Sequence, residues 1–396
     1  MYMTLALVTA VATVAAPVFE SEMVFDPAVE SHGHVHASCI VECPNGDLRV
    51  VWYENGPDLP APYYAENRDK ADNVRIGGSR KPNGGTWEKP FVMADTFGVS
   101  DNNPCMAVDK DNRLWLIYPT LTGVPDWTWG SSILRYQTST NYTDTSVPVW
   151  ASANVLIPHV PGIEDVTKST IDRMAREGGL SDQQRARFEA GIAEALKNPL
   201  SRRFGWMPRA HPITLKDGRL LLPLSNENFN VAVMGFTKDA GATWTFSNPV
   251  PEAGLTQPTV VERPDGTLVA FFRNSSNRIK KSESTDGGMT WGEVTQTGLL
   301  HPGAGIEAVQ LKNGNIVMVY NDVEESPRDQ LAVSLSTDGG QNWSHTRHIE
   351  QVPDQRFDYP SILQSIDGMI HVTYSYNLET IKYVTFNEEW VTMADK

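Results

Sequence analysis

The sequence has little cysteine, no long apolar run after its first residues, and fewer basic than acidic side chains. Only Cys39, Cys43 and Cys105 are present among 396 residues, and this low, odd number does not favour a disulfide framework. No His or Cys partner stands at metal-ligand spacing, so we expect buried thiols and neither a metal nor a cofactor. With 33 Lys and Arg against 48 Asp and Glu, the net charge of -15 argues against nucleic-acid binding.

The apolar segment 1–17 allows two interpretations. It ends in Ala-Ala-Pro like the apolar region of a signal peptide, but no Lys or Arg precedes it. One interpretation is export to a secreted or periplasmic location, and the other is a first β-strand. No apolar run of about 18 residues occurs elsewhere, so we expect no membrane span.

A motif of the form Ser/Thr-x-Asp-x-Gly-x-x-Trp recurs along the second half of the chain. Three full copies end at Trp244, Trp291 and Trp343, and a copy without the Asp ends at Trp87. The full copies are about 50 residues apart, which is the size of a propeller blade. Asp and Gly are suited to a tight turn, and Trp is suited to fill the gap beside the next strand.

A second, independent repeat consists of Asn/Asp-Gly turns between apolar strands. Asn replaces Gly in one copy and tolerates the same left-handed backbone. The turns are Asn45–Gly46, Asp111–Asn112, Asp217–Gly218, Asp265–Gly266, Asn313–Gly314 and Asp367–Gly368. Six turns predict six blades, and therefore an all-β fold in which residues 1–396 form a single six-bladed β-propeller.

One segment, residues 162–200, has helical instead of strand periodicity. Ser181 and Gln184 form a predicted capping box, and Phe188, Ile192 and Leu196 follow at i, i+4 spacing. We expect a two-helix insertion between the second and third blades. It either packs on the rim of the propeller or covers its central pocket as a lid.

The repeats that end at Trp244, Trp291 and Trp343 have the form of Asp-boxes. With them the chain resembles the sialidase (neuraminidase) superfamily over nearly its whole length. The resemblance implies a carbohydrate-active propeller, with arginines that bind a carboxylate, a tyrosine nucleophile assisted by a glutamate, and an aspartate acid/base. By position, Tyr359 matches the tyrosine, Arg273 and Arg328 match two arginines, and Asp72 lies near the aspartate. Two guanidinium groups suit bidentate binding of a carboxylate.

The residues nine positions before each turn should converge on the propeller axis, because each inner strand begins there. This set is His36 or Ala37, Asn103, Arg209, Gln257, Gly305 and Tyr359. It is more polar than a structural core requires. Arg68 is a further candidate for substrate binding, and Glu227 is a candidate source of hydrogen bonds or of another carboxylate.

Two positions depart from the pattern of the superfamily. His36 stands where its first arginine is expected, and Gln257 stands where its glutamate is expected. Glutamine cannot accept the tyrosine proton as a carboxylate does. Glu307, on the next blade, is the candidate substitute. Trp127 and Trp129 lie in a loop where they either stack on a sugar or pack a blade.

Three functions therefore stay open. The first is a sialidase-like exo-glycosidase that hydrolyses a terminal acidic sugar from a glycan or polysaccharide, with Tyr359 and Asp72 as catalytic residues. The second is another propeller enzyme, a polysaccharide lyase or a rhamnosidase acting on uronate-containing glycans, with His36 as acid or base. The third is a glycan-binding propeller without catalysis. The six turns place Arg209, Arg273 and Arg328 around one axis, which predicts a basic pocket in an acidic molecule.

Overall fold

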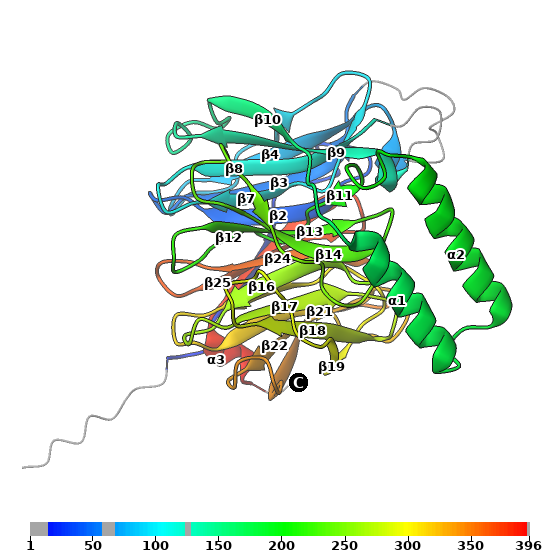
Figure 1. Cartoon of the computed structure of the whole chain (residues 1–396). Helices are drawn as coiled ribbons and strands as arrows, with labels where there is room; N and C mark the ends of the chain where they lie inside the picture. Colours follow the sequence, from blue (N-terminus) through cyan, green and yellow to red (C-terminus); the bar gives the residue numbers. More distant parts are fainter. Residues whose placement is uncertain (1–14, 58–67, 123–127, 394–396) are drawn as a thin grey trace, which may run out of the picture.

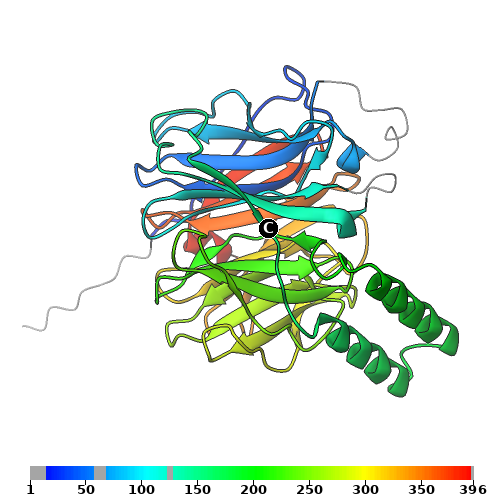
Figure 2. The same ribbon diagram turned by 45° about the horizontal axis from the view of Figure 1, so that its top comes forward.

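The chain forms six antiparallel sheets of four or five strands that surround a common axis (Figures 1 and 2). This is a computed structural model, and it describes residues 15–57, 68–122 and 128–393. The predicted six-bladed β-propeller with a two-helix insertion is confirmed. In each blade the strands pair antiparallel in chain order from the axis outward, and the connections between them range from tight turns to longer loops. The outermost strand of blade 6 is the exception to this chain order.

Blades 1 to 3 occupy the first half of the described chain. Blade 1 contains β2 (His36–Glu42), β3 (Leu48–Asn55), β4 (Val74–Lys81) and β5 (Phe91–Ala94), with the short helix η2 (Arg68–Lys70) between β3 and β4. Blade 2 contains β6 (Ser100–Asp101), β7 (Cys105–Val108), β8 (Leu114–Leu121), β9 (Ser132–Ser139) and β10 (Ser152–Leu156), with η3 (Trp129–Ser131) before β9. Blade 3 contains β11 (Trp206–Met207), β12 (Ile213–Thr214), β13 (Leu220–Asn226), β14 (Val231–Thr237) and β15 (Thr245–Phe246).

Blades 4 to 6 follow without an insertion. Blade 4 contains β16 (Thr256–Glu262), β17 (Leu268–Arg273), β18 (Arg278–Ser284) and β19 (Thr295–Leu300). Blade 5 contains β20 (Glu307–Gln310), β21 (Ile316–Asn321), β22 (Gln330–Ser336) and β23 (His345–Gln351). Blade 6 contains β24 (Phe357–Gln364), β25 (Ile370–Tyr376) and β26 (Thr380–Phe386), and the short helix α3 (Glu388–Val391) follows it.

The outermost strand of blade 6 comes from the start of the described chain. β1 (Phe19–Met23) pairs antiparallel with β26, so the first and the last described strands belong to one sheet. This strand begins after the segment 1–17 for which a strand was one interpretation. Residues 15–17 form no strand, and residues 1–14 lie outside the described part.

The Asp-box tryptophans fill the gaps between neighbouring blades. Trp244 of blade 3 packs edge-on against Trp115 of blade 2, with ring centroids 6.2 Å apart. Trp343 of blade 5 packs in the same way against Phe271 of blade 4, at 5.8 Å. Trp87, from the degenerate copy, contacts Tyr383 of blade 6 at 5.4 Å. These three rings therefore contact the preceding blade around the axis, whereas we predicted a contact with the next strand.

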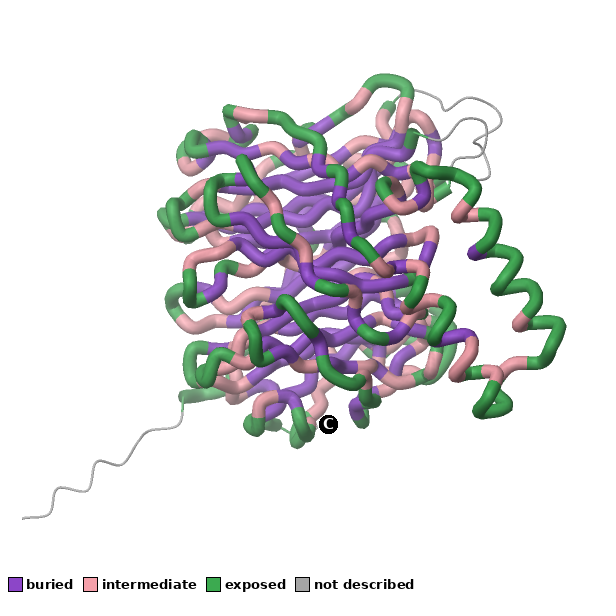
Figure 3. The backbone as a smooth tube through the Cα atoms, viewed as in Figure 1, coloured by how far each residue is buried: buried purple, intermediate pink, exposed green. Residues whose placement is uncertain are grey.

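The interior between the blades is apolar and contains the cysteines. Cys39, Cys43 and Cys105 are buried and free, as predicted. Figure 3 shows how burial is distributed along the backbone, with buried strands at the centre of the molecule and exposed turns at its edges. The cysteines belong to a core cluster shared by blades 1, 2 and 3.

The insertion consists of α1 (Ile163–Arg176) and α2 (Asp182–Lys197), between β10 and β11. The predicted capping box is present: the Ser181 hydroxyl accepts from the backbone N–H of Gln184, whose side chain accepts from the N–H of Ser181. The two helices project away from the sheets (Figure 2) and are largely exposed (Figure 3). α1 is attached to the rim, where Thr167 donates to the carbonyl of Phe229 at 2.9 Å. None of the described helices is long and apolar enough to cross a membrane.

Candidate active site

A cavity of about 660 Å³ opens at the propeller axis, and all six blades contribute to it. Its wall is mainly polar and aromatic. The lining residues are His34, His36, Tyr53, Arg68, Asp69, Asn103, Trp129, Met207, Glu227, Thr256, Gln257, Arg273, Arg328, Arg356, Tyr359 and Leu378. None of them belongs to α1 or α2, so the helices lie on the rim and do not form the predicted alternative, a lid.

Four of the predicted axial residues lie where the innermost part of their blade departs from regular strand geometry. Ala37, Asn103, Gln257 and Tyr359 have φ angles of 57°, 36°, 47° and 45°, in the left-handed region that ordinary side chains seldom adopt. In three of the four blades the pairing register of the strand shifts at this point. Such bulges re-aim side chains. Each blade thereby turns one residue toward the axis, and Asn103, Gln257 and Tyr359 reach the cavity.

The other two axial positions support Tyr359 from behind. A Cβ atom at Gly305 would lie 2.5 Å from Cδ1 of Tyr359, so only glycine leaves room for the ring. The guanidinium of Arg209 lies 5.3 Å from the centre of the same ring. Arg209 is only 1% exposed and donates to the backbone carbonyls of Ser38, Ile306 and Pro360. The prediction that Arg209 binds substrate is therefore wrong, because its donors are used inside the core.

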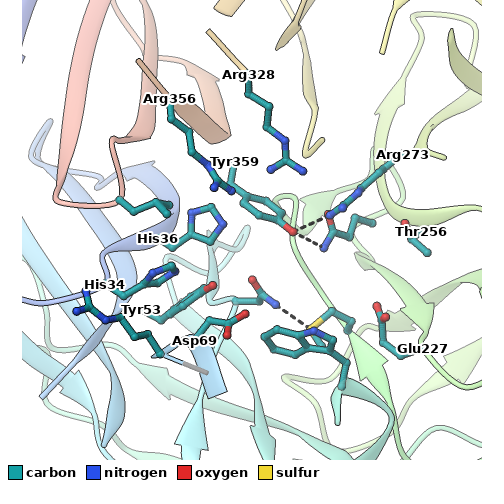
Figure 4. A pocket seen from close by; sticks show the side chains of 16 residues that line it. His34, His36, Tyr53, Asp69, Glu227, Thr256, Arg273, Arg328, Arg356 and Tyr359 are labelled. Atoms are coloured by element: carbon teal, nitrogen blue, oxygen red, sulfur yellow. Dashed lines mark hydrogen bonds between the residues drawn. The ribbon is translucent and has the colours of Figure 1, made fainter. Parts of the chain in front are cut away.

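The hydroxyl group of Tyr359 faces the cavity and receives two hydrogen bonds (Figure 4). Nη1 of Arg273 donates to it at 2.6 Å, and Nε2 of Gln257 donates at 3.3 Å. Oε1 of Gln257 accepts from the same Arg273 Nη1 at 3.1 Å. Among the described side chains, none accepts the proton of the phenol. The substitution of glutamine for glutamate thus removes the expected base and keeps the hydrogen-bonded geometry.

Histidine replaces the first arginine of the superfamily beside this tyrosine. The rings of His36 and Tyr359 meet edge to face, 4.4 Å apart, and Nδ1 of His36 lies 3.1 Å from Oγ of Ser375. Burial lowers the pKa of His36 well below its usual value, so the ring is neutral near pH 7. His34, which also lines the cavity, has a pKa lowered by burial. Neither histidine supplies the positive charge that an arginine would.

Arginine side chains occupy one side of the cavity instead. Arg273, Arg328 and Arg356 lie along this side in Figure 4, with the ring of Tyr359 between them. Arg328 and Arg356 both donate to the carboxylate of Asp358, which is fully buried. Three guanidinium groups therefore face a single cavity in a molecule of net charge -15.

Two carboxylic acids, Asp69 and Glu227, lie at the end of the cavity opposite Arg328 and Arg356 (Figure 4). Burial raises the pKa of Glu227, although Arg273 and Lys70 act in the opposite direction. Nearby, the ammonium group of Lys70 lies 5.2 Å from the ring centre of Trp129. Trp127, the other predicted aromatic contact, lies outside the described residues. The cavity thus combines an arginine side, an acid side and an aromatic ring.

Two further predictions about carboxylates need correction. Asp72 is not among the residues that line the cavity, whereas Asp69, three residues earlier on η2, is. Glu307 is 1% exposed and is not among the residues that line the cavity. Its Oε1 is 2.8 Å from Nδ1 of His211 and its Oε2 accepts from the N–H of Ile362 at 3.0 Å. Both oxygens are used to hold blades together, so Glu307 does not replace the missing base.

The remaining predicted residues do line the cavity. These are His36, Arg68, Asn103, Gln257, Arg273, Arg328 and Tyr359. We did not predict Asp69, Arg356, His34 or Tyr53. Arg356 and Tyr359 are close in the sequence, and proximity to the expected nucleophile is a signal that would have singled out this arginine.

The fold and this cavity define a class: a six-bladed propeller with Asp-box turns and an arginine-rich axial pocket. Residues 195–372 match the family model described as a BNR repeat-like domain. The chain is similar to a sialidase of Bacteroides fragilis (strain YCH46), with 24% identity over 77% of this chain and 54% of that protein. It is also similar to an anhydrosialidase of Macrobdella decora, with 25% identity over 40% of this chain and 23% of that protein.

A solved structure shows the same fold. The NanB sialidase of Streptococcus pneumoniae superposes with a TM-score of 0.66 at 13% identity, over 91% of this chain and 70% of that one. Together, the family match, the two curated relatives and this structure confirm the predicted resemblance to the sialidase superfamily. The alignments with the two curated relatives span only about a quarter and about half of their length.

Proposed function

We propose that this protein is a sialidase-like glycosidase that removes a terminal acidic sugar from a glycan. The observation that carries the proposal is the hydroxyl of Tyr359, which lies within hydrogen-bonding distance of Arg273 in a cavity that two more arginines face. A tyrosine suits an anionic sugar, because a carboxylate nucleophile would repel the carboxylate of the substrate. The similarity to sialidases in sequence and fold supports the same class of reaction.

In the proposed reaction, guanidinium groups of Arg273 and Arg328 bind the carboxylate of the sugar and set its orientation. The oxygen of Tyr359 forms a bond to the anomeric carbon while the bond from that carbon to the leaving oxygen breaks. The phenol proton passes to water in the cavity, since Gln257 cannot take it. Asp69, in place of the predicted Asp72, donates a proton to the leaving oxygen. A water molecule then forms a bond to the anomeric carbon while the bond from that carbon to the Tyr359 oxygen breaks. The proton of this water restores the phenol, and the proton held by the cavity water returns to Asp69.

A second candidate is a lyase or rhamnosidase that acts on uronate-containing glycans. The observation in its favour is His36, a neutral imidazole at the cavity wall beside Tyr359, which has the protonation state of a general base. In that reaction the arginines would neutralise a uronate carboxylate. Binding of a glycan without catalysis is the third candidate, and the several ionisable groups of the cavity weigh against it.

A substrate panel with a Tyr359→Phe variant tests the proposal. We expect the wild type to release free sialic acid from a fluorogenic sialoside and the variant to lose at least about a hundredfold in kcat, because the attacking oxygen is absent. An increase in ultraviolet absorbance from an unsaturated uronate would indicate the lyase. Full activity of Tyr359→Phe would contradict the catalytic assignment, and glycan binding without turnover would favour the third candidate.

A further inference from the structure

We propose that Asp358 is a positioning residue that holds Arg356 and Arg328 as a fixed pair for the carboxylate of the substrate. This inference deepens the proposed function and rests on it for the identity of the ligand. It assigns Arg356, on blade 6, as the guanidinium group that supplies the charge missing at His36. We call the three residues Arg328, Arg356 and Asp358 the arginine fork.

The contacts within the arginine fork use both oxygens of one buried carboxylate. Nη1 of Arg328 donates to Oδ1 of Asp358 at 2.5 Å, and Nε of Arg356 donates to Oδ2. Asp358 is 0% exposed and lies on β24 directly before Tyr359. Burial alone would raise its pKa, but the guanidinium groups of Arg328 and Arg356 lower it, so the group stays ionised. The same strand therefore fixes the carboxylate and the proposed nucleophile.

Arg328 and Arg356 both line the cavity and have N–H donors that the described contacts do not use. A guanidinium group has five N–H donors, and each of these two donates only one or two in the described contacts. The Arg356 side chain is half exposed and long, so without Asp358 it would sample many rotamers. A receptor that is ordered before binding loses less entropy when the anion arrives. Asp358 thus makes the site more selective for carboxylates, although it is itself negative.

The position of the arginine fork fits the gap that His36 leaves. In Figure 4 Arg356 lies beside His36, and Arg328 and Arg273 continue the same side of the cavity. His36 is neutral and 6% exposed, so it contributes no charge there. All three arginines line the cavity that Tyr359 also lines. A carboxylate placed between them would contact guanidinium groups from blades 4, 5 and 6.

The proposed role of Asp358 predicts a change in anion affinity opposite to the change that charge alone would cause. Replacing Asp358 with Asn removes a negative charge close to the binding site, which by charge alone would strengthen binding of an anion. If Asp358 positions the arginines, the same variant weakens binding, because the neutral amide releases Arg356. The direction of the change therefore separates positioning from charge.

Isothermal calorimetry with N-acetylneuraminic acid and its methyl ester measures this directly on the full chain. We expect Arg356→Gln and Asp358→Asn each to weaken binding of the acid about tenfold or more, with little effect on the ester. Arg185→Gln, on the exposed surface of α2, is the matched control and should bind as the wild type does. Melting temperatures show whether Asp358→Asn folds, and Arg356→Gln tests the arginine fork even if it does not.

Several results would overturn the proposal: no binding of the acid by the wild type, unchanged affinity in Arg356→Gln, tighter binding by a folded Asp358→Asn, or equal losses for acid and ester. Binding of the acid through Arg356 without release of sugar from any glycoside would support the arginine fork and contradict the proposed glycosidase. The two proposals can therefore fail separately.

Discussion

At the scale of single residues, Gln257 is the departure with the clearest chemical consequence. It holds the geometry of Tyr359 through its amide, and it provides no base for the phenol proton. The retained hydrogen bonds suggest that one substitution can restore the missing group without rebuilding the cavity.

We predict that Gln257→Glu increases kcat for a fluorogenic sialoside about tenfold or more, because a carboxylate at this position can accept the proton as the phenol attacks. Arg273 lies next to the new charge and compensates it. Steady-state kinetics measure the change, with Gln257→Ala as the control that removes the side chain. A decrease in kcat for Gln257→Glu equal to that of Gln257→Ala would show that Tyr359 needs no base there.

Prediction from sequence located the residues of the repeated position along each inner strand, but it did not show which of their side chains enter the cavity. Counting back from the turns located Asn103, Gln257 and Tyr359, because each blade repeats the same strand and bulge. The same count also selected Arg209, which is buried behind the ring of Tyr359. A sequence repeat predicts the position of a residue along its strand. Whether its side chain points into the cavity or into the core depends on the packing across the axis.

At the scale of the structural element, the Asp-box turn is stabilised by one carboxylate. Asp286 accepts hydrogen bonds from the hydroxyl groups of Thr290 at 2.6 Å and Ser284 at 2.8 Å. It also accepts from the N–H groups of Met289 and Thr290, both at 3.0 Å. A Cβ atom at Gly288 would lie 2.8 Å from Phe236 of blade 3, so the turn also requires glycine for its close approach.

We predict that Asp286→Ala lowers the melting temperature at pH 7 and that the difference from the wild type disappears in acid. The hydrogen bonds from Thr290 and Ser284 lower the pKa of Asp286 to about 2. The unfolded chain has a value near 4. A group with a lowered folded pKa stabilises the fold above the unfolded value and loses this contribution as the pH falls toward 2.

Thermal unfolding of both proteins between pH 7 and pH 2 tests this, with Asp111→Ala as the control. The carboxylate of Asp111 bonds to the exposed side chain of Lys110, an interaction that adds little stability. Equal melting temperatures for Asp286→Ala and the wild type at pH 7 would contradict the role of the Asp-box carboxylate.

The turns and helices were predictable because their signals are local. Asn/Asp-Gly pairs and the capping box act within a few residues, and the structure has them where the sequence indicates. The bulges that direct Gln257 and Tyr359 have no such signal. Gln257 and Tyr359 both have positive φ angles, which glutamine and tyrosine seldom adopt. Such a conformation persists only where the surrounding structure stabilises it, so it cannot be read from the residue types.

At the scale of the whole molecule, β1 closes the propeller. Five residue pairs join it to β26, so the first described strand completes the last blade and covers its edge. Phe19 stacks on Trp390 with ring centroids 4.6 Å apart, and Asn387 accepts from the N–H of Val18 at 2.9 Å. The closure therefore links the two ends of the described chain by contacts that no single blade could make.

The cavity depends on this closure, because its residues come from all six blades and Tyr359 belongs to the blade that β1 completes. We predict that Phe19→Ala lowers the melting temperature by about 1–2 °C, the shift expected for a loss near 1 kcal/mol in a domain of 396 residues. Phe97→Ala is the matched control, since Phe97 is fully exposed and should change nothing. Differential scanning calorimetry of both variants measures the shift. Equal melting temperatures for the two would mean that the sheet of blade 6 is stable without the aromatic contact of β1. A lower melting temperature for Phe19→Ala alone would show that a strand at the outer edge contributes to the stability of the whole propeller, and therefore of the fold that holds the cavity.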